Sequence, residues 1–77
     1  MPLSSNTLLL HERESDGVTV EMYAEIHSRH SADITLLIHE ADGTGFALRT
    51  RNGAEALEMF YHPYLYDNRP YSVRAVA

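Results

Sequence analysis

The sequence predicts an α+β fold: a four-stranded antiparallel β-meander, one C-terminal helix packed on one face of the sheet, and a short fifth strand. Three observations predict it. Apolar and polar side chains alternate with a period of two along residues 18–27 and again along 33–40. Asp-Gly pairs, which favour hairpin turns, occur at 16–17 and 42–43. After residue 52 the apolar spacing becomes helical.

The 77 residues predict a single domain, 1–77, in which the polar segment 1–6 is expected to be frayed. The expected strands are residues 7–14, 18–27, 33–40 and 44–51. The clearest of them is the second, where Val18, Val20 and Met22 alternate with polar residues. Such alternation predicts a sheet with one buried face and one solvated face.

The hydrophobic pattern also predicts the turns. A two-residue Asp16-Gly17 loop would place Leu10 opposite Tyr23 and mix the two faces of the sheet. A three-residue loop that begins at Ser15 instead places Leu10 opposite Met22, so we expect that loop, with Gly17 in the left-handed region. The same reasoning predicts a three-residue loop at residues 41–43.

The expected helix begins after Asn52, which has the spacing of a capping box with Glu55. Its apolar residues at helical spacing would cover the sheet, and these are Leu57, Phe60, Tyr61 and Tyr64. Pro63 disfavours a helical conformation at the residue before it, so the helix is expected to end there. Alternation from Tyr71 to Val76 predicts the fifth strand, which would close an edge of its own sheet or pair with a second chain.

Composition excludes several classes of site. The chain has no cysteine, which excludes disulfides and thiolate metal sites. A net charge of −5, most of it in the first half, disfavours direct nucleic-acid binding. No apolar run approaches a membrane span, and the N-terminus lacks the basic region of a signal peptide, so a cytoplasmic location is expected. No nucleophile, phosphate-loop or cofactor motif is present, which predicts a non-enzymatic protein without a cofactor.

The aromatic C-terminal segment is the main candidate site. Tyrosine and arginine are enriched at protein interfaces, and a small domain without disulfides often gains stability by oligomerisation. We therefore expect a protein partner and a homo-oligomer, a homodimer in the first instance. The contact would use this segment or an exposed strand edge. The candidate partner-binding residues are Tyr61, Tyr64, Tyr66, Arg69, Tyr71 and Arg74.

Two histidine groups are candidate metal sites. His27, His30 and Asp33 lie within one expected loop, although Arg29 among them would oppose a cation. If Ala24 faces Leu36, Glu21 would lie between His11 and His39 on the outer face of the sheet. That row could bind a metal or respond to pH, and an ordinary cross-strand ion pair gives the same pattern. A small metal-binding module is therefore one alternative function.

Charged side chains on the outer face give a further alternative. Arg49 and Arg51 are expected opposite Thr35 and Asp33, where they would contact an anion or form a salt bridge. Acidic residues give the first three strands a negative face, namely Glu12, Glu14, Asp16, Glu21, Glu25 and Glu40. A solvated face explains this pattern, and so does an acidic inhibitor that occupies the nucleic-acid-binding site of a partner.

The segment Ala56-Leu57-Glu58-Met59-Phe60-Tyr61-His62-Pro63-Tyr64 resembles part of a group of short uncharacterised proteins of actinobacteria and their phages. Members carry a terminal helix of the form Ala-Leu-x-x-Phe-x-His-Pro-Phe/Tyr after several strands. The resemblance covers about ten residues closely and implies a small accessory or phage-encoded protein that acts through a partner. It transfers no catalytic residue.

Overall fold

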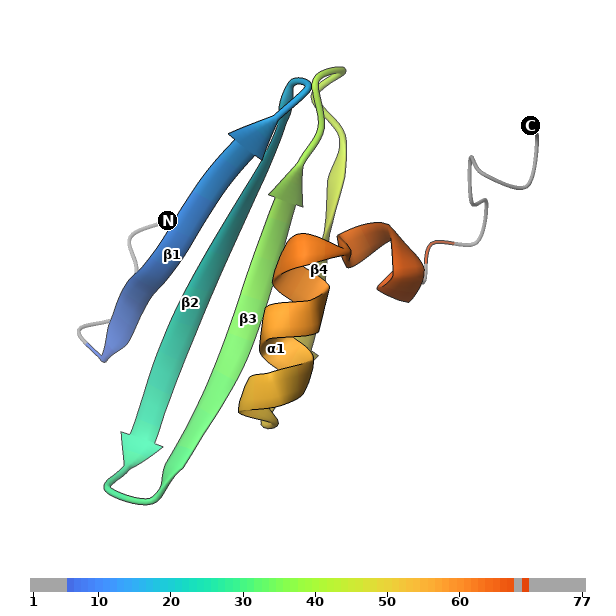
Figure 1. The fold of residues 1–77 in the computed structure, drawn as a ribbon. Helices are drawn as coiled ribbons and strands as arrows, with labels where there is room; N and C mark the ends of the chain where they lie inside the picture. Colours follow the sequence, from blue (N-terminus) through green and yellow to red (C-terminus); the bar gives the residue numbers. More distant parts are fainter. Residues whose placement is uncertain (1–5, 68, 70–77) are drawn as a thin grey trace.

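The computed structural model describes residues 6–67 and residue 69. Within them the chain forms an antiparallel sheet in the order β1-β2-β3-β4, with α1 on one face (Figure 1). The elements are β1 Thr7–Ser15, β2 Val18–Ser28, β3 Ser31–His39, β4 Gly45–Thr50, α1 Gly53–Tyr61 and the 3₁₀ helix η1 Pro63–Tyr66. The predicted α+β meander is confirmed. The expected fifth strand lies outside the described residues, as do residues 1–5.

The first hairpin has a two-residue turn and not the three-residue loop that the sequence predicts. Ser15 pairs with Val18, so the loop has two residues, and Asp16 and Gly17 both have positive φ, 55° and 80°. That combination is the type I′ turn that Asp-Gly favours. A β-bulge between Leu9 and His11 restores the separation of faces by adding one residue to β1. Leu10 is therefore not opposite Met22, and the prediction of a three-residue loop was wrong.

Of the other two hairpins, one has the predicted loop and the other has a shorter loop than predicted. In the β3–β4 hairpin Ile38 pairs with Phe46, and the Gly43 amide donates to the Glu40 carbonyl at 3.0 Å, which confirms the three-residue loop at 41–43. The expected polar loop between β2 and β3 is shorter than predicted, because Ser28 pairs with Ser31. Asn6, in the segment expected to be frayed, donates through its side-chain amide to the Ile26 carbonyl at 3.1 Å.

The helix begins where the cap was predicted. The Asn52 side-chain oxygen accepts from the amides of Ala54 and Glu55, at 2.9 and 3.1 Å. The Glu55 carboxylate does not complete a capping box, however. It accepts from the Thr50 hydroxyl at 2.6 Å, and that hydroxyl in turn accepts from the Asn52 amide at 3.0 Å. This chain of hydrogen bonds joins the end of β4 to the start of α1.

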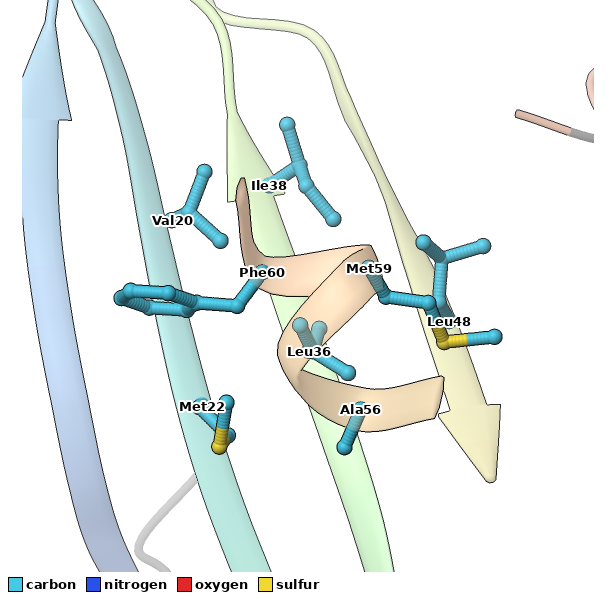
Figure 2. Packing of buried hydrophobic residues seen from close by; sticks show 8 residues of the cluster. All are labelled: Val20, Met22, Leu36, Ile38, Leu48, Ala56, Met59 and Phe60. Atoms are coloured by element: carbon cyan, nitrogen blue, oxygen red, sulfur yellow. The ribbon is translucent and has the colours of Figure 1, made fainter. Parts of the chain in front are cut away.

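The core lies between α1 and the sheet face that carries it, which we call the inner face (Figure 2). Its buried members are Val20, Met22, Leu36, Ile38, Leu48, Ala56, Met59 and Phe60. The helix buries Ala56, Met59 and Phe60, whereas Leu57 and Tyr61, which were expected to cover the sheet, are exposed. Figure 1 shows α1 over β3 and β4, so β1 and the lower half of β2 extend beyond it.

Candidate functional site

The open edge of β1 carries an apolar cluster, the β1 leucine edge, defined as Leu8, Leu9 and Leu10. Their exposed fractions are 51%, 50% and 46%. β1 is an edge strand of the described sheet. Leu10 is the bulged residue, so the cluster ends at the bulge and the charged half of β1 follows it. An edge strand presents backbone donors and acceptors on its open side, so apolar side chains there favour pairing with another strand.

Sequence reasoning missed this cluster, although its signal was visible. Three consecutive leucines cannot all point to one face of a strand, so at least one must lie on the face opposite α1. The structure confirms that consequence: Leu8 pairs with Ala24 on the inner face, whereas Leu9 pairs with Tyr23 on the outer face. Neither leucine is buried by the described part of the chain.

Two of the predicted partner residues, Tyr64 and Arg69, belong to intrachain contacts at the β3–β4 hairpin. Arg69 donates from its Nη1 atom to Glu40 at 2.7 Å and from Nη2 to Asp67 at 2.8 Å, with its guanidinium 4.5 Å from the centre of the Phe46 ring. The Tyr64 hydroxyl donates to the other Glu40 oxygen at 2.7 Å. We call Glu40, Tyr64, Asp67 and Arg69 the hairpin clamp.

The clamp shifts the ionisation of its members. Hydrogen bonds from Arg69 and then Tyr64 hold the pKa of Glu40 below its usual range. Burial and the hydrogen bond to Glu40 raise the pKa of Tyr64 to about 12. Both carboxylates of the clamp raise the pKa of Arg69. These groups are therefore fixed in their charged or hydrogen-bonded forms near neutral pH, and the clamp holds the segment after η1 against the hairpin.

The remaining predicted partner residues lie in different surroundings. Tyr66 packs on the core and donates its hydroxyl to Glu58, which raises the pKa of Tyr66. Tyr61 is 59% exposed, with its ring 5.1 Å from that of Phe60 in an edge-to-face arrangement. Tyr71 and Arg74 lie outside the described residues. Tyr61 is thus the most exposed of the four that the structure describes.

Tyr61 also lines a cavity of about 510 Å³ between the first hairpin and the turn from α1 to η1. Apolar surface comes from Val18 and from Leu65, which is 75% exposed. Arg13 lies in its wall and donates to the Phe60 carbonyl at 2.9 Å and the Tyr61 carbonyl at 3.3 Å, at the C-terminus of α1. We call this the Tyr61–Leu65 groove.

A second hollow, of about 640 Å³, lies on the inner face beyond the helix. Its floor is apolar and comes from the two central strands, with Ala24, Ile26, Ala32 and Ile34. Ile26 is 39% exposed, and Leu57 on the nearby helix is 50% exposed. Apolar surface thus continues from the β1 leucine edge across the uncovered part of the inner face.

The predicted His11–Glu21–His39 row does not form. β2 and β3 pair with Ala24 opposite Ile34 rather than Leu36, and the bulge in β1 moves His11 to the inner face, where its ring lies 5.7 Å from that of Phe60. Glu21 and His39 still meet on the outer face, with 2.9 Å between Oε1 and Nε2. What remains is an exposed cross-strand pair.

In the other predicted metal group, two of the three residues, His27 and Asp33, lie close together. His27 Nε2 lies 2.9 Å from Asp33 Oδ2. His30 lies instead in the turn between β2 and β3, where it lines the inner-face hollow. Glu25, which the metal hypothesis had not included, takes its place: one ligand atom from each of Glu25, His27 and Asp33 lies within 4.8 Å of the others.

Arg49 and Arg51 occupy their predicted positions, opposite Thr35 and beside Asp33. Arg51 Nε donates to Asp33 Oδ1 at 2.8 Å, which confirms the expected salt bridge. Hydrogen bonds from His27 and then Arg51 hold the pKa of Asp33 below its usual range. The acidic face is smaller than expected, because Glu40 belongs to the hairpin clamp.

Neither helix in the described part of the chain has the length and apolarity needed to cross a membrane. Comparison with protein-family models, curated proteins and solved structures gives no match.

Proposed function

We propose that this protein is a non-enzymatic protein-interaction module that forms a homodimer through the β1 leucine edge. The observation that carries the proposal is the half-exposure of three consecutive leucines on an edge strand. Antiparallel pairing of β1 with the same strand of a second copy would extend the sheet through a two-fold axis, in which each copy uses the same surface.

The energetics favour the apolar half of β1 as the centre of the contact. Burying apolar surface contributes about 25 cal/mol per Å², so completing the burial of a half-exposed leucine contributes on the order of 1 kcal/mol. The other half of β1 carries Glu12, Arg13 and Glu14, whose burial would carry a desolvation cost. A contact centred on Leu9 buries the leucines and leaves the charged residues at its rim.

The test is the molar mass in solution by light scattering and sedimentation equilibrium over a wide concentration range. We expect a monomer–dimer equilibrium for the wild-type chain and a monomer for Leu9→Arg, because a charge on an edge strand opposes pairing. Leu65→Arg is the matched control: it adds the same charge at a more exposed leucine, 75% against 50%, in η1. It should leave the dimer intact.

Two outcomes would reject this interface. A wild-type chain that stays monomeric at every concentration excludes the homodimer. A dimer that survives Leu9→Arg but is lost in Leu65→Arg would place the contact at the Tyr61–Leu65 groove. That groove belongs to the aromatic C-terminal segment, which the sequence predicts to be the partner-binding surface. Tyr61, Tyr71 and Arg74 would then be the contact residues, with Tyr64, Tyr66 and Arg69 supporting them from within the fold.

The acidic-inhibitor function is a second candidate, and one observation favours it. Glu12 lies directly opposite Glu21 on the outer face, and Glu14 and Glu25 follow on the same face by alternation. Like charges directly opposite destabilise a sheet, so their presence suits a cationic partner. Binding to an immobilised arginine-rich peptide should weaken steeply with salt and be reduced by Glu12→Gln. Salt-independent or absent binding would reject this candidate.

A further inference from the structure

We propose that Glu25, His27 and Asp33 form a zinc site on the outer face of the sheet, at the end where β2 turns into β3. Asp33 pairs directly with Glu25 across the strands. His27 lies two positions after Glu25, at the irregularity that ends the β2–β3 pairing, and its Nε2 atom lies 2.9 Å from Asp33 Oδ2. Their nearest ligand atoms all lie within 4.8 Å of one another. The three groups therefore converge at one place on the sheet.

The two facing carboxylates, Glu25 and Asp33, favour binding of a cation. Glu25 is half-buried and faces another carboxylate directly, an arrangement that destabilises a sheet unless something neutralises it. Asp33 has partners in His27 and Arg51, but no hydrogen bond or ion pair from the described residues reaches the Glu25 carboxylate. A divalent ion between the two carboxylates would give Glu25 a partner that the described residues do not supply.

The hydrogen bonds around Asp33 suit metal coordination. Arg51 Nε occupies Oδ1 at 2.8 Å, whereas Oδ2 points to His27 Nε2 at 2.9 Å. Carboxylates that bind metals are commonly held by a hydrogen bond on their second oxygen, and Arg51 supplies one here. The charge of Arg51 opposes a cation, but its side chain is 77% exposed, so solvent screens that repulsion.

The donor set selects the ion. One imidazole nitrogen, two carboxylate oxygens and a water satisfy four-coordinate Zn²⁺, whereas Ca²⁺ and Mg²⁺ prefer oxygen ligands throughout. Zn–N and Zn–O bonds of about 2.0–2.2 Å place tetrahedral ligand atoms roughly 3.3 Å apart. The observed 2.9 Å between His27 and Asp33 needs to widen by only a few tenths of an ångström. The ion then takes the place of the hydrogen at Nε2: the neutral imidazole keeps its one proton at Nδ1, and an imidazolium releases its other proton to solvent.

The experiment titrates tag-free protein, first stripped with EDTA and exchanged into metal-free buffer, with zinc chloride in a calorimeter. We expect one zinc per chain. At about 100 times the dissociation constant, zinc should raise the melting temperature by on the order of 10 °C. Calcium chloride in a parallel titration should give no saturable heat. An unchanged melting temperature and no heat with zinc would overturn the proposal.

His27→Gln and His30→Gln are matched variants, because each removes one exposed histidine from the same end of the sheet. His27→Gln should weaken zinc binding at least about tenfold, and Glu25→Gln should weaken it too, whereas His30→Gln should bind as the wild type does. Equal losses in His27→Gln and His30→Gln would show adventitious binding by surface histidines and reject the site. Circular dichroism in EDTA verifies that each variant keeps the sheet.

Discussion

At the scale of single residues, the hairpin clamp shows how one carboxylate organises a surface. Glu40 accepts from Arg69, Tyr64 and Thr44, and its side chain is only 17% exposed. Hydrogen bonds to charged groups contribute more than neutral ones, roughly 1.5–3 kcal/mol in favourable cases. The segment after η1 therefore depends on Glu40 for its attachment to the β3–β4 hairpin.

We expect Glu40→Gln to lower the free energy of unfolding at pH 7 by about 1–2 kcal/mol, measured by urea denaturation. Glu14→Gln, at an exposed position on β1, is the control and should change it by less than about 0.5 kcal/mol. An effect in Glu40→Gln no larger than in the control would show that the clamp does not stabilise the fold.

The same residue gives the clamp a pH dependence. Because folding lowers the pKa of Glu40, its contribution to stability is fully present above the unfolded pKa of about 4.3. That contribution is lost as the pH falls through the lower, folded pKa. The difference in stability between the wild type and Glu40→Gln should therefore shrink in acid. A difference that stays constant from neutral pH down to acid would contradict this assignment.

At the scale of elements, the cap of α1 is the local feature that the sequence predicted best. A capping side chain acts on amides two and three residues away, so residue spacing alone can identify it. Asn52 follows this rule, whereas the capping-box role of Glu55 does not hold, because Thr50 at the end of β4 competes for its carboxylate. Local capping is thus modified where a neighbouring element supplies a better donor.

Asn52→Ala should destabilise the protein by about 1 kcal/mol, which corresponds to a melting temperature lower by roughly 4–8 °C. Asn52→Asp keeps a side-chain oxygen that accepts from the Ala54 and Glu55 amides, so it should melt close to the wild type. Thermal unfolding followed by circular dichroism compares the three proteins. Equal losses in both variants would assign the effect to something other than the cap.

The first hairpin shows where element-level reasoning fails. Alternation requires Leu10 and Met22 to share a face, and a three-residue loop satisfies this if β1 is regular. The chain instead keeps the two-residue Asp16-Gly17 turn and adds a bulge at Leu10. Loop length and a bulge compensate for each other, so the pattern of faces cannot distinguish them.

At the scale of the whole molecule, the sheet is larger than the helix that covers it. The principal extents are 45 × 23 × 21 Å, and α1 lies over β3 and β4 (Figure 1). Half-exposed apolar residues consequently remain along β1, at Ile26 and at Leu57. Exposed apolar surface of this kind favours association with a second molecule.

If the dimer is linked to folding, the melting temperature should rise with protein concentration, by about 4 °C for each tenfold increase. A Leu9→Arg chain should melt at a temperature that does not depend on concentration. Differential scanning calorimetry over a dilution series measures both proteins. The same concentration dependence in the two proteins would place the association somewhere other than the β1 leucine edge.

The sequence by itself determined the strands, the start of the helix and the Asp33–Arg51 pair, because these follow from alternation, spacing and short-range pairing. Tertiary structure alone decided the shift of β2 against β3 and the bulge that moved His11 off the outer face. It also decided that Glu25, and not His30, lies beside His27 and Asp33 in the candidate metal group. The physical reason is the period of two: a slip of two residues preserves every face, so the pattern fixes which side a residue occupies but not which residue lies opposite it.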